Sequence, residues 1–393
     1  MPTGRGWAAL GVAAALFALW AGFGEVELMA TGTFLVAAVA VGVGFVRFAS
    51  PAVGVTRRIY PPQVHEGDEV TVEVDIVTER RLRNVFVEDT VHGLGTARFA
   101  AARTGPGQRV TARYEVLCRT RGVYPVGPAE VAITDPFALV ERRSPTGELD
   151  RLMVYPRVER LTGFPAVRGI DPAVQSTRPT FAPYGGEDFY TLREYQVGDD
   201  LRKVHWPSSA KRDALMIRQL EVPWQARALV LLDARADRYP IPQAFEHAVR
   251  GAASAVSHLY QGGFSPELWA TERAPGSRSD NRYQQAMEIL ASIQPTPNLD
   301  LRRTVARLRR QGVGGGALIV VTGVPDDGVL GAYRVLAKDF TRTVVMAVAD
   351  RPGETAGTFQ RAGAVTVYAG PSGAWAPAWR TAMELSWSTA SVG

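Results

Sequence analysis

One histidine stands close to two carboxylates in a segment whose residue types suit acid–base chemistry. His205 follows Asp199 and Asp200 within one or two helical turns, and Ser208 and Ser209 come shortly after it. A hydrolase would need a nucleophile beside the histidine and a third group to orient it. No Gly-x-Ser-x-Gly turn surrounds the serines. We favour a structural ion-pair network, with a metal-dependent hydrolase centred on Asp199, Asp200 and His205 as an alternative.

A second group of candidate oxygen ligands stands at the ends of two apolar runs. Ala228–Leu232 ends at Asp233, and a later run ends at Thr322. Carboxylate and hydroxyl oxygens suit Mg²⁺, but Arg235 adds a positive charge and no Asp directly follows Thr322. Too few oxygen ligands stand here to hold the ion, so we expect no bound cofactor.

The elements that would position these residues alternate between strands and helices. Residues 226–393 form a doubly wound α/β domain with a parallel sheet, because short apolar runs alternate with stretches of helical spacing. The expected strands are 228–232, 267–270, 317–321, 343–349 and 364–368, and the expected helices are 243–260, 283–293, 301–310 and 329–340. Before them, in 187–225, Asp199 caps a short helix that Pro207 ends, and a strand follows at 215–222.

Residues 52–156 follow a period of two instead. Val70, Val72 and Val74 alternate with polar residues, and further alternating runs are separated by Gly-rich turns. Such a pattern predicts an antiparallel β-sandwich, with Cys118 on the apolar side of its strand as a core residue. Residues 157–186 lose the alternation and gain prolines, so we expect an extended linker along the surface.

Residues 1–51 contain two uncharged apolar runs, Trp7–Phe23 and Leu28–Val46. Each is long enough to span a membrane, so we predict a transmembrane helical hairpin. Cations stand outside the runs, Arg5 before the first and Arg47, Arg57 and Arg58 after the second, while the turn carries Glu25 and Glu27. This places both termini and the following domains in the cytoplasm of a two-span membrane protein, with Arg57 and Arg58 near anionic headgroups. A cleaved signal peptide is the alternative.

Composition excludes several classes of protein. Lys and Arg number 44 against 39 Asp and Glu, a formal net charge of +5, and the cations form no basic run of the kind that binds nucleic acid. The single cysteine excludes an intramolecular disulfide and a Cys-based zinc site. An apolar fraction of 46% excludes wholesale disorder.

The most specific pattern is a set of polar and aromatic residues spread through 187–225. It comprises Glu187, Asp188, Phe189, Leu192, Arg193, Glu194, Tyr195, Gly198, Asp199, Asp200, Arg202, His205, Trp206 and Glu221. Upstream stand Arg121-Gly122-Val123-Tyr124, Gly127-Pro128 and Asp135-Pro136-Phe137. Together these residues closely resemble the signature of a bacterial family of unknown function, the domain family numbered fifty-eight. With the hairpin and the α/β end, the resemblance covers nearly the whole chain.

The resemblance implies a C-terminal domain similar to von Willebrand factor A and a membrane-anchored protein associated with a MoxR-type AAA+ ATPase. Such domains often bind Mg²⁺ through Asp-x-Ser-x-Ser, and both serines are missing from Asp233-Ala234-Arg235-Ala236-Asp237. The resemblance therefore implies a degenerate metal site at Asp233, with Mg²⁺-dependent adhesion there as a second alternative function. No enzymatic activity comes with the family. We predict a non-enzymatic scaffold or adaptor that presents this domain to the ATPase or its client on the cytoplasmic face, with other membrane or envelope proteins as further partners.

Overall fold

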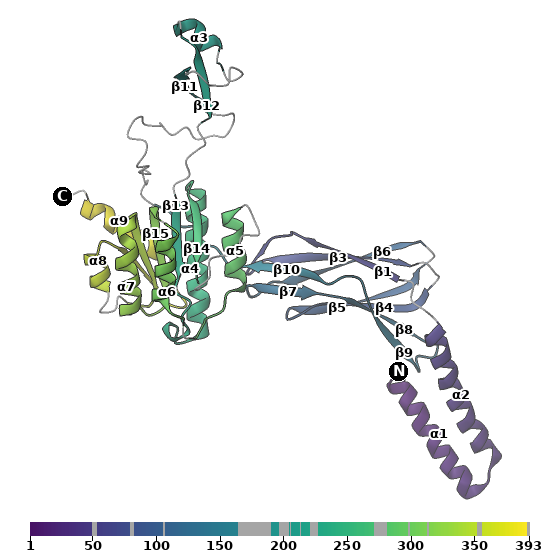
Figure 1. The fold of residues 1–393 in the computed structure, drawn as a ribbon. Helices are drawn as coiled ribbons and strands as arrows, with labels where there is room; N and C mark the ends of the chain where they lie inside the picture. Colours follow the sequence, from purple (N-terminus) through teal and green to yellow (C-terminus); the bar gives the residue numbers. More distant parts are fainter. Residues whose placement is uncertain are drawn as a thin grey trace. The chain divides into compact units, whose positions relative to one another are not determined.

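A computed structural model gives the fold of the chain (Figure 1). It describes residues 1–48, 53–78, 82–104, 107–163, 190–195, 204, 206–212, 214–220, 227–270, 281–297, 299–312, 314–351 and 356–390. The chain divides into two compact units. The N-terminal unit comprises Met1–Val158 and Met287–Ile293, and the α/β unit comprises Glu159–Ala286 and Gln294–Gly393.

Two apolar helices begin the N-terminal unit, as predicted. They are α1 (Gly4–Phe23) and α2 (Val26–Phe48), joined by a tight turn at Gly24, whose positive φ of 73° suits a glycine. Gly32 of α2 lies against the ring of Phe17 of α1, so the two helices pack closely as a hairpin. Both are long and apolar enough to cross a membrane, judged by length and composition.

Two mainly antiparallel sheets follow the hairpin. A three-stranded sheet has the order β1-β3-β6, formed by Val53–Tyr60, Glu69–Thr78 and Arg109–Leu117. A seven-stranded sheet has the order β2-β10-β7-β4-β8-β9, with β5 also paired to β4. Its strands are Val64–His65, Asp150–Tyr155, Gly122–Val126, Leu82–Val91, Ala129–Thr134, Glu141–Thr146 and Gly95–Thr104. We call these two sheets the antiparallel body.

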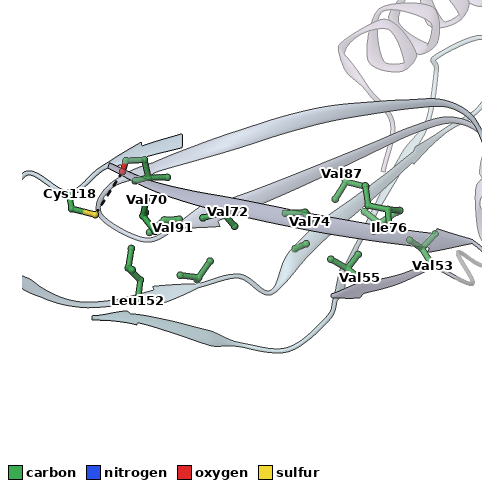
Figure 2. Close-up of a cluster of buried hydrophobic side chains, with 14 of the residues drawn as sticks. Val53, Val55, Val70, Val72, Val74, Ile76, Val87, Val91, Cys118 and Leu152 are labelled. Carbon is green, nitrogen blue, oxygen red and sulfur yellow. Dashed lines mark hydrogen bonds between the residues drawn. The ribbon is translucent and has the colours of Figure 1, made fainter. Parts of the chain in front are cut away.

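One hydrophobic core takes side chains from both sheets (Figure 2). The alternating residues Val70, Val72 and Val74 of β3 have no exposed surface, and Val87 of β4 faces the same cluster. Cys118 is fully buried there too, which confirms its prediction as a core residue, and burial raises the pKa of its thiol. The period of two was therefore a sound guide to which side of each strand is buried.

A buried ion pair crosses this core and corrects one prediction. The Arg57 guanidinium donates through Nε to both carboxylate oxygens of Asp89, at 2.9 and 3.0 Å, and through Nη1 to Asp150 at 3.1 Å. Tyr114 donates its hydroxyl to the same Asp89 at 2.8 Å. Since the side chain of Arg57 is only 1% exposed, it cannot lie among lipid headgroups as we expected; Arg58, 66% exposed, remains at the surface.

The α/β unit contains the predicted parallel sheet. Its five strands have the order β14-β13-β15-β16-β17, and every neighbouring pair is parallel. They are Ser265–Trp269, Arg227–Leu232, Gly315–Thr322, Phe340–Val348 and Val365–Ala369. The helices are α4 (Pro242–Gln261), α6 (Leu301–Arg310), α7 (Asp327–Leu336), α8 (Ala356–Arg361) and α9 (Trp375–Ala390). Helix α5 (Arg282–Ser292) begins in this unit, and its residues from Met287 onward belong to the N-terminal unit.

Helices cover both faces of this sheet. Leu229 and Leu231 point to one face, where they join a cluster with residues of α6, α7 and α8. The alternating residues Val230 and Leu232 are equally buried on the other face, where α4 packs against the strands. A strand buried on both faces reads as a continuous apolar run, which is why 228–232 could be assigned correctly.

Helix α9 closes the α4 face through two aromatic contacts. Trp375 stacks on His247 with ring centroids 4.7 Å apart, and Trp379 meets His258 edge-on at 5.6 Å. Gly251 allows the approach, because a Cβ there would lie 2.8 Å from the Trp375 ring. Burial lowers the pKa of both histidines, so both favour the neutral form in the folded unit.

The first residues of the predicted linker pack against the α/β unit. Leu161 is only 4% exposed, and the Thr162 carbonyl accepts a hydrogen bond from the Trp379 indole at 3.0 Å. Glu159 accepts from the Ala376 backbone N–H at 2.9 Å, at the first turn of α9. Residues 159–162 of this predicted surface connection are thus fixed to the α/β unit by a long-range partner, in a segment that has no periodicity of its own.

Candidate functional site

Most of the residues singled out in 187–225 lie outside the described part of the chain. These are Glu187, Asp188, Phe189, Gly198, Asp199, Asp200, Arg202, His205 and Glu221. The hydrolase centred on Asp199, Asp200 and His205 therefore stays a prediction, and so does the alternative in which Arg193, Glu194 and the two aspartates form an ion-pair network while His205 packs with Trp206.

The described pieces of that segment form a small hairpin and one helix. Strand β11 (Tyr190–Glu194), which includes Arg193, pairs antiparallel with β12 (Met216–Leu220), and the Tyr195 N–H continues the pairing to the Leu215 carbonyl at 2.7 Å. Helix α3 (Trp206–Arg212) begins with an exposed Trp206. Pro207 lies in its first turn, where a missing N–H has no cost, so the prediction that Pro207 ends a helix is wrong.

The other candidate lies fully within the described residues, at the carboxyl ends of β13 and β15. In the order β14-β13-β15-β16-β17 the chain winds outward in opposite directions from these two strands. Loops diverge at such a switch point, and open α/β sheets bind their ligands there. Asp233 follows β13 and lies beside β15, because its N–H donates to the Val321 carbonyl at 2.8 Å.

Arg235 joins the two carboxylates at this switch point. Its guanidinium donates to both oxygens of Asp233, through Nε and Nη2 at 2.9 Å each. It also donates to both oxygens of Asp326, through Nη1 at 2.9 Å and Nη2 at 2.8 Å. Thr322 adds its hydroxyl to Asp233 Oδ2 at 3.0 Å. All four carboxylate oxygens are thus bound to one cation of the same chain; we call these four residues the strand-end cluster.

The surrounding backbone holds the strand-end cluster in place. Tyr239 donates its hydroxyl to the Asp233 carbonyl, and the Val324 N–H donates to the Arg238 carbonyl at 2.9 Å. A Cβ on Gly323 would lie 2.1 Å from the Arg238 carbonyl oxygen, so this close approach requires glycine. Burial, together with the Asp233 charge, raises the pKa of the Tyr239 hydroxyl well above its ordinary value.

Asp326 has a second role as the N-cap of α7. Its Oδ1 accepts the Val329 N–H at 2.9 Å, and Arg238 Nη1 lies 3.1 Å from its Oδ2. Burial acts to raise the pKa of Asp326, but hydrogen bonds from Arg235 and Val329 and the charges of both arginines lower it overall. For Arg235, burial acts to lower the pKa, and its hydrogen bonds to both aspartates raise it overall. Asp326 and Arg235 are therefore both charged near neutral pH.

The strand-end cluster does not fit a divalent cation. Mg²⁺ needs carboxylate or hydroxyl oxygens at close to 2 Å, and here a guanidinium occupies the space between the two aspartates. A second cation would meet that positive charge at short range. Among the described residues, no group of three His, Cys, Asp or Glu side chains is arranged to hold a metal ion.

Two features of this site escaped the sequence reasoning. A second carboxylate was expected directly after Thr322, whereas Asp326 stands four positions after Thr322. An acidic residue directly before a helical stretch is a cap signal, and Asp326 had that position. Arg235 was noted only as an obstacle to metal binding; its bonds to both aspartates depend on how β13 and β15 are paired.

Part of the upstream signature serves a structural contact inside the N-terminal unit. Arg121, 8% exposed, donates to the Leu290 carbonyl at 2.6 Å and the Ile293 carbonyl at 2.8 Å. These carbonyls end helix α5 within the stretch Met287–Ile293 that belongs to the same unit. Arg121 therefore caps a helix C-terminus, where carbonyls lack intrahelical partners and favour a cation.

Comparison with known proteins agrees with the signature. A protein of Bacillus subtilis (strain 168), named as the uncharacterized protein YeaD, is 26% identical over 289 residues, which is 68% of this chain and 69% of that protein. Among solved structures, the CARDB domain of the PF1109 protein from Pyrococcus furiosus is 17% identical and covers 27% of this chain and 96% of that domain, with a TM-score of 0.21. The C-terminal domain of wzt is 13% identical and covers 34% of this chain and 86% of that one, also with a TM-score of 0.21.

The family match locates the signature more closely. Residues 191–360 match the family described as protein of unknown function DUF58. This range includes β11, α3, the strand-end cluster and four of the five parallel strands. The match confirms the resemblance drawn from the sequence for this part of the chain: residues 191–360 are similar to the DUF58 family.

Proposed function

We propose that this chain is a non-enzymatic, membrane-anchored scaffold whose α/β unit presents its strand-end loops to a protein partner. The observation that carries the proposal is the strand-end cluster itself. At the edge where sheets of this kind usually bind small ligands, internal ion pairs satisfy every oxygen of Asp233 and Asp326. What remains accessible is a fixed, mixed-charge surface, which suits a protein partner better than a metal or a substrate.

Partly exposed charges at the rim of the cluster would make the contact. The side chain of Asp237 is 63% exposed and pairs with Arg238, which is 23% exposed; Asp326 is 28% exposed. Rim charges of this kind steer association and set partner choice more than they add affinity. The partner we infer is a MoxR-type AAA+ ATPase, or its client, on the strength of the DUF58 resemblance. That resemblance also supports a von Willebrand A-like α/β unit and a β-sandwich for the antiparallel body.

The helical hairpin would anchor this scaffold. Helices of 20 and 23 residues match the thickness of a bilayer, and Arg5 and Arg47 stand at the hairpin ends opposite the turn that carries Glu25 and Glu27. The distribution of cations supports a cytoplasmic location for both termini and both units. A metal-dependent adhesion site at Asp233 has less support, because Arg235 already binds that carboxylate.

A capture experiment with matched charge reversals tests the proposal. The full chain, purified in nanodiscs, is crosslinked to the MoxR-type ATPase from the same organism with nucleotide present. Wild type should capture the ATPase, and Asp237→Arg should reduce capture several-fold. Asp339→Arg serves as the matched control, because Asp339 is an exposed acid in the turn before β16, at the opposite edge of the sheet. No capture by wild type, or equal loss for both variants, would contradict the proposal.

A further inference from the structure

The turn between β8 and β9 contacts the helical hairpin. Asp135 in this turn is 1% exposed; its carboxylate accepts the Val140 N–H at 2.5 Å and the Phe137 N–H at 2.9 Å. These bonds close the segment 135–140 into a rigid loop, and its Ala138 has a positive φ of 57°. We call this segment the Asp135 turn. It contains the Asp135-Pro136-Phe137 part of the sequence signature.

Both helices meet the Asp135 turn at close range. The Thr3 N–H donates to the Leu139 carbonyl at 2.8 Å, and the Thr3 hydroxyl, which caps α1, donates to the Ala138 carbonyl at 2.7 Å. A Cβ on Gly6 would lie 2.2 Å from the Leu139 oxygen. On α2, a Cβ on Gly42 would lie 3.2 Å from the Val140 side chain. Glycine on each helix therefore lets the turn enter between the ends of the hairpin (Figure 1).

The position of these glycines along the helices sets the depth of the turn. Gly6 lies 17 residues before Phe23, the end of α1, and Gly42 lies 16 residues after Val26, the start of α2. At about 1.5 Å per residue, both contacts lie about 24–26 Å from the tip of the hairpin. A bilayer has a hydrocarbon core of about 30 Å. A hairpin that spans it would place the Asp135 turn at the boundary between the acyl chains and the headgroups.

The exposed residues of this region suit such a boundary. Phe137 is 73% exposed, although the backbone of the turn around it is held by hydrogen bonds to Asp135. Arg142, at the start of β9, donates to the Arg47 carbonyl at the end of α2 at 3.3 Å, so cations lie next to the turn. Aromatic rings and arginines are the side chains that settle at the membrane interface, the ring towards the acyl chains and the cation towards the phosphates.

We propose that the Asp135 turn is a membrane-contact surface, in which Phe137 enters the outer acyl-chain layer and Arg142 meets anionic headgroups. The hairpin and the antiparallel body would then meet the lipid as one rigid piece. This inference rests on the proposed membrane anchoring. It adds the Asp135 turn to α1 and α2 as a third element in contact with lipid.

Depth-dependent quenching tests the inference on the full chain in nanodiscs that contain anionic lipid. A single new cysteine, Phe137→Cys, is labelled with an environment-sensitive nitrobenzoxadiazole dye. Wild type gives the background, because its Cys118 is buried. Leu117→Cys is the matched control, an apolar residue of the same body that is 43% exposed and stands next to Cys118. Val36→Cys, in the middle of α2, reports on insertion of the hairpin itself.

Lipids with a doxyl quencher near the headgroup end of the acyl chain should quench the Phe137→Cys probe several-fold more than the Leu117→Cys probe. Quenchers at the methyl end of the chain should act on the Val36→Cys probe instead. If the Val36→Cys probe is quenched while the Phe137→Cys probe behaves like the Leu117→Cys probe, this inference fails and the anchoring stands. If none of the three is quenched, the anchoring and this inference fail together.

Discussion

Each unit of the molecule contains an arginine held by two aspartates, and the two clusters differ in where they lie. Arg57 binds Asp89 and Asp150 inside the antiparallel body, with Arg57 and Asp89 at most 1% exposed. Arg235 binds Asp233 and Asp326 at the edge of the parallel sheet, where its side chain is 12% exposed. An arginine paired with two aspartates thus holds two sheets together in one unit and forms part of the surface in the other.

The two clusters show how a structural ion pair differs from a surface site. The Arg57–Asp89 pair is buried between two sheets and acts on stability, and within that cluster Asp150 is the residue that reaches solvent, with 40% of its side chain exposed. A pair at a switch point is fixed equally well, yet Asp326 and Arg238 beside it keep 28% and 23% of their side chains in solvent. The comparison predicts large stability effects for the Arg57 cluster, and smaller stability effects joined to partner effects for the strand-end cluster.

The largest expected effect is on Arg57. Replacing it with methionine leaves Asp89 buried without its cation, which should lower the free energy of unfolding by about 3–5 kcal/mol. The double variant Arg57→Met, Asp89→Leu should be more stable than the single one, because no buried charge is left unpaired. The stability of each variant is measured by the reaction of Cys118 with a thiol reagent in urea, since Cys118 is buried in the same core. If the free energy of unfolding of the Arg57→Met variant lies within about 1 kcal/mol of the wild-type value, this prediction is wrong.

The next effect concerns Arg235. Its replacement by alanine removes four charge-assisted hydrogen bonds and should cost about 2–3 kcal/mol in the α/β unit. Lysine should restore only part of this, because an ammonium cannot bind two carboxylates in a fixed planar geometry. Tryptophan fluorescence in urea follows the unit through the buried Trp269, Trp375 and Trp379. If lysine restores the full stability, charge alone holds the cluster together and the planar geometry of the guanidinium is not needed.

Two glycines give a finer test of how tightly each cluster is enclosed. A Cβ on Gly127 would lie 2.1 Å from Arg57 Nη2, and one on Gly323 would lie 2.1 Å from the Arg238 carbonyl. Gly127 also has a φ of 79°, so alanine there adds backbone strain. Each alanine variant should cost about 1–3 kcal/mol, with Gly127→Ala the more harmful. The same two urea assays measure them, and the reverse order would mean that the strand-end cluster is the more rigidly enclosed.

The smallest effect is a pH dependence of the strand-end cluster. The pKa of Asp326 is lower in the folded chain than its ordinary value, so the stability that its carboxylate contributes is present above about pH 4. That contribution is lost as pH falls through the lower folded pKa. Wild type and Asp326→Asn, which keeps a capping side chain, should therefore differ in urea midpoint at pH 7 and converge towards pH 3. A constant difference across that range would exclude a charge effect.

Periodic segments of the fold could be predicted from the sequence, and long-range partners could not. Strands such as 228–232 and helix 301–310 follow from runs and spacings that are local. Helix α9 was missed although it holds two fully buried tryptophans, because its stretch contains Pro377 and lacks a clear polar face. Arg57 was placed among lipid headgroups because its partner Asp89 stands 32 residues away and no local pattern joins them.

The candidate site shows the same division. Asp233 and Thr322 could be found because each ends a buried strand. Asp326 and the bridging role of Arg235 needed the pairing of β13 with β15, which brings residues about 90 positions apart into one cluster. The family signature was confirmed over 191–360, yet it marks residues without saying which of them touch.

The fastening of α9 has a consequence for how the chain is made. The backbone of Ala376 and the indole of Trp379 bind Glu159 and Thr162, residues 217 positions earlier in each case. The α/β unit is thus tied at its start by its own last helix, and its closing contacts are among the longest in the sequence. Such non-local closure is slow, and it cannot occur before α9 has been synthesised. The helical hairpin precedes both segments in the chain, so it is synthesised while the α/β unit is still open.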